Sequence, residues 1–231
     1  MKVIGLIGGM SWNSTLEYYR LINEGVSHRL GGFHSARLVL YSLDFEDIEL
    51  AQHEARWDDA TDILVKAGTG LKRAGADFLV ICTNTMHKVA DLVAERTDLP
   101  LLHIGDAVGN AITERGLNKV GLLGTRFVME EHFYRDRLEK CFGIEVLVPS
   151  EAEQNVVDRL IYEELCQGKI IDTSRRACLN IIEGLTGRGA EGIILGCTEL
   201  PLLIRPADVS VPVFDTTQLH AEAAVERALG D

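Results

Sequence analysis

The chain has 231 residues, of which 46% are hydrophobic and 25% are charged, and its formal net charge is −12. This length allows one large domain or two smaller ones of roughly 100 residues each. The acidic charge argues against nucleic acid as a partner, because a phosphate backbone requires a basic surface. No apolar run approaches the ~18 residues that a membrane span needs, so we expect no membrane association.

The start of the chain and its cysteines favour a cytoplasmic location. The first residues lead directly into a strand-like run and lack the apolar core and cleavage site of a signal peptide. The five cysteines are an odd number without a CxxC pair, which favours reduced thiols over a disulfide framework. The seven histidines are scattered and lack ligand spacing to Cys or carboxylate residues, so no metal site is predicted.

Short apolar runs alternate with longer helical patterns along the whole chain. In chain order the pattern predicts strand 3–7, helix 13–29, strand 36–41, helix 57–74, strand 78–81, helix 86–96, strand 101–104, helix 106–115, strand 120–123, helix 129–141, strand 145–148, helix 155–167, helix 173–186, strand 192–195, strand 211–214 and helix 217–229. Alternation of strands and helices predicts βαβ units in a doubly wound parallel sheet.

Three segments of the first half recur in the second half at offsets of 117, 114 and 112 residues. The pairs are 2–8 with 119–124, 74–85 with 188–199, and 100–104 with 212–215. Recurrence of all three in the same order favours duplication of a half-domain. We therefore predict an α/β fold with two pseudo-symmetric, doubly wound parallel-sheet lobes, an N-terminal lobe of 1–103 plus 214–231 and a C-terminal lobe of 104–213, with the active site in the cleft between them.

Thr83 and Cys197 are equivalent in this repeat, since each follows a buried strand. Facing lobes bring the two side chains to a ligand from opposite sides. Inversion of a stereocentre needs a proton removed from one face and one returned to the other, so each group acts as acid in one direction and base in the other. A thiol suits this role when nearby N–H donors lower its pKa. The hydroxyl of Thr83 is a far weaker acid and needs assistance.

The loops beside these two residues contain donors for a substrate carboxylate. The segment after Thr83 joins side-chain donors to the start of a predicted helix, where anions are favoured, and the segment after Cys197 repeats the arrangement. Glycines before Met10 let a ligand approach the backbone. The loop after the second strand supplies Gln52 and His53. The predicted substrate-binding residues are Met10, Ser11, Gln52, Asn84, Thr85, Thr198 and Glu199.

Other conspicuous residues have simpler interpretations. Four cysteines are interpreted as core residues: Cys82, Cys141, Cys166 and Cys178. Cys82 directly precedes Thr83, so on an extended segment it points to the opposite face. His87 is interpreted as a packing or helix-start residue. The glycines of 5–9 lack the G-x-G-x-x-G spacing and are a weak signal for a dinucleotide.

The chain resembles the aspartate/glutamate racemases over nearly its whole length. The resemblance is carried by the blocks 5–12, 83–87 and 196–199, and it is closest to the broad-specificity amino-acid racemase branch of enterobacteria. It implies two similar α/β lobes, a homodimer, and a two-base mechanism on an amino-acid substrate that needs neither pyridoxal phosphate nor any other cofactor.

Two departures from the family pattern bear on mechanism and specificity. Most of the family has Cys where this chain has Thr83, although the enterobacterial branch shares the Thr, so unequal bases predict unequal behaviour toward the two enantiomers. Aspartate-specific members hold the side-chain carboxylate with Arg and Lys, where this chain has Ile48 and Cys166. Neutral or polar amino acids therefore remain open as substrates, with Gln52 and Met10 shaping the pocket.

Three other functions are compatible with the sequence. An arylmalonate-type decarboxylase or related isomerase would use Cys197 alone, since only one of the two equivalent positions carries a thiol. A bilobal amino-acid-binding protein would bind without turnover, and a Rossmann-type dehydrogenase would bind a nicotinamide cofactor.

Overall fold

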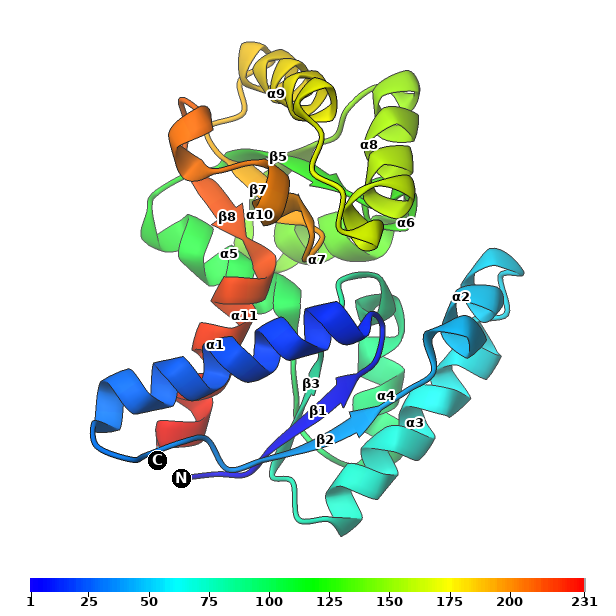
Figure 1. Ribbon diagram of the computed structural model, residues 1–231, viewed down its shortest axis with the longest axis vertical. Coiled ribbons are helices and arrows are strands. Elements are labelled where there is room, and N and C mark those ends of the chain that lie inside the picture. Colours follow the sequence, from blue (N-terminus) through cyan, green and yellow to red (C-terminus); the bar gives the residue numbers. More distant parts are fainter. Residues whose placement is uncertain (231) are drawn as a thin grey trace. The chain divides into compact units, whose positions relative to one another are not determined.

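The computed structural model describes residues 1–230, which divide into two compact units, each built on a four-stranded parallel sheet flanked by helices (Figure 1). Unit 1 comprises Met1–Ile104 and the residues from His220 onward, and unit 2 comprises Gly105–Leu219. The predicted α/β class with two parallel-sheet lobes is confirmed. The chain passes from unit 2 back to unit 1 inside the last helix, whereas the sequence analysis put that boundary before the helix.

Unit 1 contains the first sheet and the helices wound around it. Its elements are β1 (Ile4–Gly8), α1 (Trp12–Leu30), β2 (Leu38–Ser42), α2 (Phe45–His53), α3 (Trp57–Arg73), β3 (Phe78–Ile81), the 3-10 helix η1 (Thr85–Val89), α4 (Ala90–Thr97) and β4 (Leu101–Leu102). The C-terminal helix α11 (Thr216–Leu229) also belongs to unit 1 from His220 onward.

Unit 2 repeats this plan with its own sheet. Its elements are α5 (Ile104–Glu114), β5 (Lys119–Gly124), α6 (Arg126–Glu130), α7 (His132–Phe142), β6 (Glu145–Leu147), α8 (Glu151–Glu163), η2 (Leu165–Gln167), α9 (Asp172–Gly187), β7 (Ile193–Gly196), α10 (Leu200–Leu203), η3 (Pro206–Asp208) and β8 (Val213–Asp215). The first residue of α5 belongs to unit 1.

The two sheets have matching strand orders, β2-β1-β3-β4 and β6-β5-β7-β8. Their registers also match, because Gly5 pairs with Leu79 in the first sheet and Gly121 pairs with Ile193 in the second. At both glycines an added Cβ would meet a neighbouring side-chain carbon at 2.8 Å, so a larger residue at either position would have to displace that neighbour. The glycines are 116 residues apart, one fewer than the offset read from the sequence.

Alternate residues of the first sheet bury against different helices, which is the signature of a doubly wound sheet. Ile4 and Leu6 pack with residues of α1 and α11, whereas Ile7 packs with residues of α2, α3 and α4. Figure 1 shows the same arrangement of these helices on the two sides of β1 and β3. Because β1 and β3 are parallel, their carboxyl ends lie at the same edge of the sheet. Helices cover both faces of the sheet below that edge.

Three local elements differ from the sequence prediction. Helix α2 was expected as a loop, but Asp44 caps its N-terminus by accepting a hydrogen bond from the Glu46 N–H at 3.2 Å. The helix expected at 129–141 is divided between α6 and α7, because Glu131 has an extended backbone. The helix expected at 86–96 begins as the 3-10 turn η1.

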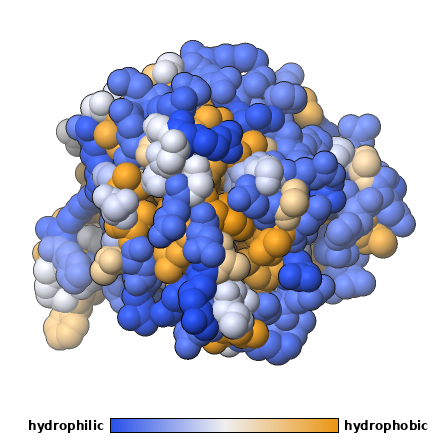
Figure 2. All heavy atoms as spheres, turned by 90° about the horizontal axis from the view of Figure 1, so that it is seen from above, coloured by the Kyte–Doolittle hydropathy of each residue, from blue (hydrophilic) through white to orange (hydrophobic). Residues whose placement is uncertain are grey.

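The surface is mixed, because several large hydrophobic side chains, Trp12, Leu16 and Phe33 among them, are exposed. The face seen in Figure 2 is mostly hydrophilic, with hydrophobic residues in small groups among the charged ones. Within residues 1–230, no helix is both long enough and apolar enough to cross a membrane.

Candidate active site

Thr83 lies two residues beyond β3, at the carboxyl edge of the first sheet. The preceding residue continues the ladder, since the Cys82 N–H donates to the Ile7 carbonyl at 2.9 Å. Cys82 is fully buried in the cluster between the sheet and α1, as predicted for a core residue. Thr83 itself is half-buried, and Asn84 and Thr85 after it are buried. The strand therefore brings a hydroxyl and buried polar side chains to the edge where parallel sheets bind ligands.

His87 contacts the backbone of Thr83 directly. Its Nδ1 lies 2.8 Å from the Thr83 carbonyl oxygen, and because a carbonyl only accepts, Nδ1 carries the proton. The ring is 3% exposed, and within residues 1–230 its Nε2 has no hydrogen-bond partner. Burial, followed by the neighbouring His103 and His220, holds the pKa of His87 well below its usual value. The ring is therefore neutral, and only one of its two nitrogens is satisfied.

The glycine loop after β1 is filled by the protein itself. Gly9 has φ +91°, and a Cβ there would overlap the backbone of Leu43, which follows β2. The Gly9 N–H donates to Thr15 Oγ1 at 2.8 Å, and Ser11 caps α1 by accepting from the Ser14 N–H at 3.3 Å. At Gly9 the missing side chain makes room for the main chain of Leu43, and the approach of a ligand to these glycines stays a prediction.

Gln52 lies on helix α2 and not on a loop. Its amide Nε2 donates to Met86 Sδ at 3.0 Å, and Gln52 is 5% exposed. Met10, Ile48 and Met86 belong to the same buried cluster, so Gln52 links α2 to the turn that follows Thr83. His53, by contrast, is exposed and lies 2.9 Å from the Glu49 carboxylate.

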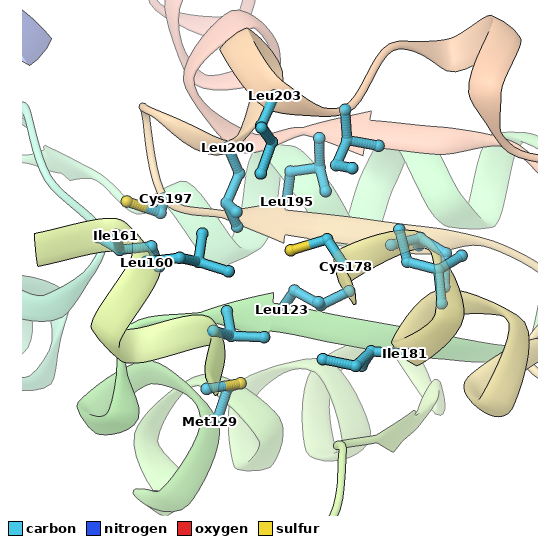
Figure 3. Packing of buried hydrophobic residues seen from close by; sticks show 14 of the residues in the cluster. Leu123, Met129, Leu160, Ile161, Cys178, Ile181, Leu195, Cys197, Leu200 and Leu203 are labelled. Atoms are coloured by element: carbon cyan, nitrogen blue, oxygen red, sulfur yellow. The ribbon is translucent and has the colours of Figure 1, made fainter. Parts of the chain in front are cut away.

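Cys197 directly follows β7, at the carboxyl edge of the second sheet. Figure 3 shows it at the margin of the unit 2 core, with its sulfur directed away from Leu195 and Leu200, whereas Cys178 lies in the middle of the core. The Cys197 thiol donates to Glu199 Oε2 at 3.0 Å, and the Thr198 hydroxyl donates to the same oxygen at 2.6 Å. Glu199 is itself buried, so the thiol faces a carboxylate with little solvent around it.

These surroundings keep the proton on sulfur. Burial is the largest cause that raises the pKa of Cys197 well above its usual value, and the negative charge of Glu199 and the hydrogen bond to it act in the same direction. From the sequence alone, backbone N–H groups are expected to lower the pKa of Cys197. A backbone hydrogen bond does act in that direction, but burial and the carboxylate outweigh it. The resting group is a thiol and not a thiolate.

The other cysteines differ among themselves. Cys178 is buried, and burial raises its pKa to about 12. Cys166 is half-buried beside the same cluster, and burial followed by the charge of Glu199 raises its pKa to about 12. Cys141 is exposed, so its interpretation as a core residue is wrong. It lies in the last turn of α7, where one side of the helix faces solvent.

The structure thus contains two groups of predicted site residues, one at the carboxyl edge of each sheet. The first contains six of the predicted residues: Met10, Ser11, Gln52, Thr83, Asn84 and Thr85. The second contains Cys197, Thr198 and Glu199. Sequence reasoning missed two connections, that of His87 to Thr83 and that of Glu199 to the thiol. The four-residue spacing of Thr83 and His87 was the signal for the first contact, and the short polar turn after Cys197 was the signal for the second.

The model of the Asp/Glu/Hydantoin racemase family matches residues 7–224 of the chain. Among solved structures, a candidate Asp/Glu racemase from Yersinia pestis is 53% identical, with a TM-score of 0.95 and 100% of both chains covered. PH1733, an aspartate racemase homologue from Pyrococcus horikoshii, is 38% identical, with a TM-score of 0.88 and the same full coverage. An arylmalonate decarboxylase mutant, at 16% identity and a TM-score of 0.56, shares the fold over 99% of this chain and 94% of its own.

Curated relatives are more distant. The broad specificity amino-acid racemase RacX of Bacillus subtilis is 22% identical over 98% of both chains. The glutamate racemase of Pseudomonas entomophila is 28% identical over 69% of this chain, and the match spans 58% of the length of that enzyme. The family match extends over nearly all of both units, and the chain belongs to the Asp/Glu/Hydantoin racemase family.

Proposed function

We propose that the protein is an amino-acid racemase that works without pyridoxal phosphate or any other cofactor, and that Thr83 and Cys197 exchange the α-proton on opposite faces of the substrate. The observation that carries the proposal is the equivalence of the two residues. Both follow the third strand of matching sheets, 114 residues apart, which is also the spacing of the paired residues Leu79 and Ile193. A reaction with one acid–base group per face requires such a pair.

The resting protonation states of Thr83 and Cys197 determine how a catalytic cycle begins. Both groups rest protonated, since the pKa of Cys197 is raised and a hydroxyl does not ionise near neutral pH. One proton must leave before either group can act as a base. Glu199 Oε2, 3.0 Å from the sulfur, is the acceptor in place for it. Transfer breaks the S–H bond, forms an O–H bond on Glu199 and leaves a thiolate that can take the α-proton.

Thr83 completes the inversion from the other face. Its hydroxyl donates a proton to the carbanion, and the resulting alkoxide regains one from solvent or a neighbouring acid. In the reverse direction Thr83 must act as the base, which is the harder step for a hydroxyl. Asn84, Thr85 and Thr198 are polar side chains beside the two groups, and we assign them, with Met10, Ser11 and Gln52, to holding the substrate.

The test is α-proton exchange followed by NMR in D2O, on separate L- and D-amino acids without added cofactor. We expect loss of the α-proton signal together with appearance of the other enantiomer. Ranking the amino acids by rate gives the specificity, including whether aspartate and glutamate are accepted. Full activity in Cys197→Ala would contradict the two-base assignment, and no exchange with any amino acid would contradict the proposal as a whole.

An arylmalonate-type decarboxylase that uses Cys197 alone is the second candidate. It is favoured by the presence of a thiol at only one of the two equivalent positions. Release of carbon dioxide from a phenylmalonate, without inversion of any amino acid, would support it. Tight binding of an amino acid without exchange or decarboxylation would instead indicate a binding protein.

We also propose that the racemase is a homodimer, as the resemblance to its family implies, and that it is cytoplasmic, as its odd number of cysteines without a CxxC pair favours. Sedimentation equilibrium should give a mass near twice the 25.5 kDa of one chain. A mass equal to that of one chain at micromolar concentration would contradict the dimer.

A further inference from the structure

Three buried histidines gather in unit 1 behind Thr83. His87 comes from η1, His103 directly precedes α5, and His220 comes from α11. The His87 ring packs edge-on against His103, with ring centroids 4.7 Å apart, and against His220 at 5.4 Å. The exposed fractions of His87, His103 and His220 are 3%, 5% and 0%. Packing on two sides fixes the plane of the His87 ring.

His220 has both of its ring nitrogens hydrogen-bonded. Its Nε2 lies 2.9 Å from the Leu102 carbonyl, so Nε2 carries the proton. Its Nδ1 therefore accepts, and the Tyr18 hydroxyl donates to it at 2.8 Å. Tyr18 is fully buried on α1. His220 is thus a satisfied core residue that holds α11 and α1 in place and supports the His87 ring.

His87 differs, because its one N–H is directed at the backbone of Thr83. The donor and the accepting carbonyl are 2.8 Å apart in a buried environment, where a hydrogen bond is stronger than in water. Thr83 has left the strand ladder, and the carbonyl accepts this bond just before the η1 turn. The bond restrains the segment that carries the Thr83 hydroxyl.

We infer that His87 is a positioning residue for Thr83, which sets the placement of the hydroxyl through the Nδ1–H bond to the Thr83 carbonyl while the neighbouring histidines hold the ring. The inference rests on the proposed function. His87 does not itself transfer the substrate proton, because its Nδ1 proton is held by a carbonyl and its ring is neutral. Loss of this hydrogen bond should slow proton transfer by Thr83 and leave proton transfer by Cys197 unchanged, since Cys197 belongs to unit 2.

The test compares two amide variants. In His87→Asn the side-chain N–H can occupy the Nδ1 position, whereas in His87→Gln the amide reaches the Nε2 position and leaves the Thr83 carbonyl without its donor. The readout is the ratio of inversion to α-proton exchange without inversion, measured in D2O on the enantiomer that Cys197 deprotonates. The enantiomer is identified by its continued exchange in Thr83→Ala. Exchange needs Cys197 alone, and inversion also needs Thr83.

We expect His87→Gln to lower this ratio at least about tenfold, since a misplacement of about 1 Å can cost about a hundredfold in rate, and His87→Asn to keep the ratio within about threefold of the wild type. Thr97→Val is the control from elsewhere in unit 1. It removes the buried hydrogen bond from Thr97 Oγ1 to the Val93 carbonyl, 2.7 Å long, so both rates should change by one common factor and leave the ratio unchanged.

Equal ratios in His87→Asn and His87→Gln would overturn the inference and leave the racemase proposal intact. A changed ratio in Thr97→Val as large as that in His87→Gln would also overturn it, because the effect would then belong to the core in general. No exchange by the wild-type protein on any amino acid would instead overturn the proposed function, and the inference with it.

Discussion

At the scale of single residues, the contact between Cys197 and Glu199 predicts a measurable change in thiol acidity. Glu199→Gln removes the negative charge beside the sulfur and replaces the carboxylate with an amide, so the pKa of Cys197 should fall, although burial keeps it above its usual value. The check is the pH dependence of Cys197 alkylation by iodoacetamide, followed by mass spectrometry of its peptide. The exposed Cys141 serves as an internal reference whose profile should not move.

The two proposed bases predict opposite outcomes on substitution. Cys197→Ser replaces the thiol with a hydroxyl, a much weaker acid, and should lower inversion by at least about a hundredfold. Thr83→Cys provides a better acid–base group at the equivalent position and should preserve or raise inversion. Initial rates followed by circular dichroism on the best substrate would distinguish these results. Loss of activity in Thr83→Cys with unchanged stability would contradict a proton-transfer role for Thr83.

At the scale of elements, the loop after β1 is sensitive to a single methyl group. Gly9 and Gly75 both have φ +91°, but an added Cβ overlaps the Leu43 backbone at Gly9 and meets no atom within 4 Å at Gly75. Gly75→Ala should cost roughly 1–2 kcal/mol of unfolding free energy from backbone strain alone. Gly9→Ala should cost about 3 kcal/mol or more, because steric overlap adds to the same strain. Urea denaturation of the two variants measures the difference.

The elements also show how far sequence reasoning extends. Strands with runs of apolar residues, such as β3 and β7, were placed to within a residue, because complete burial leaves a continuous hydrophobic signal. Helix α2 was missed, since it is short and its cap is the main indication. Hydrogen bonds such as those of His87 and Glu199 depend on which rotamer the packing selects, and a one-dimensional pattern does not specify it. The sequence therefore predicted that Thr83 and Cys197 follow buried strands, but it did not predict the hydrogen bonds beside them.

At the scale of the whole molecule, the buried His87 predicts acid sensitivity. Its folded pKa lies well below the unfolded value of about 6.5, so the unfolded chain binds an additional proton as the pH falls below that value. Stability is fully present above about pH 6.5 and should decline at lower pH by up to about 1.4 kcal/mol per pH unit until the folded pKa is reached.

Urea denaturation between about pH 5 and pH 7.5 tests this expectation, with the pH range set by the usual histidine pKa. His87→Asn removes the titrating group and should flatten the dependence, whereas the same substitution at the exposed His34 should leave it in place. An equally steep decline in His87→Asn would assign the acid sensitivity to other groups.

The discontinuity of unit 1 has a consequence for synthesis on the ribosome. Unit 2 is a continuous stretch of chain, whereas unit 1 needs the final turns of α11, including Ala221, Ala224 and Val225, to cover one face of its sheet. The segment made first therefore cannot complete its core until α11 has left the exit tunnel, although domains generally fold in order from the N-terminus. The second-made unit can finish folding before the first. Until α11 has been made, the apolar face that it covers is open to chaperones.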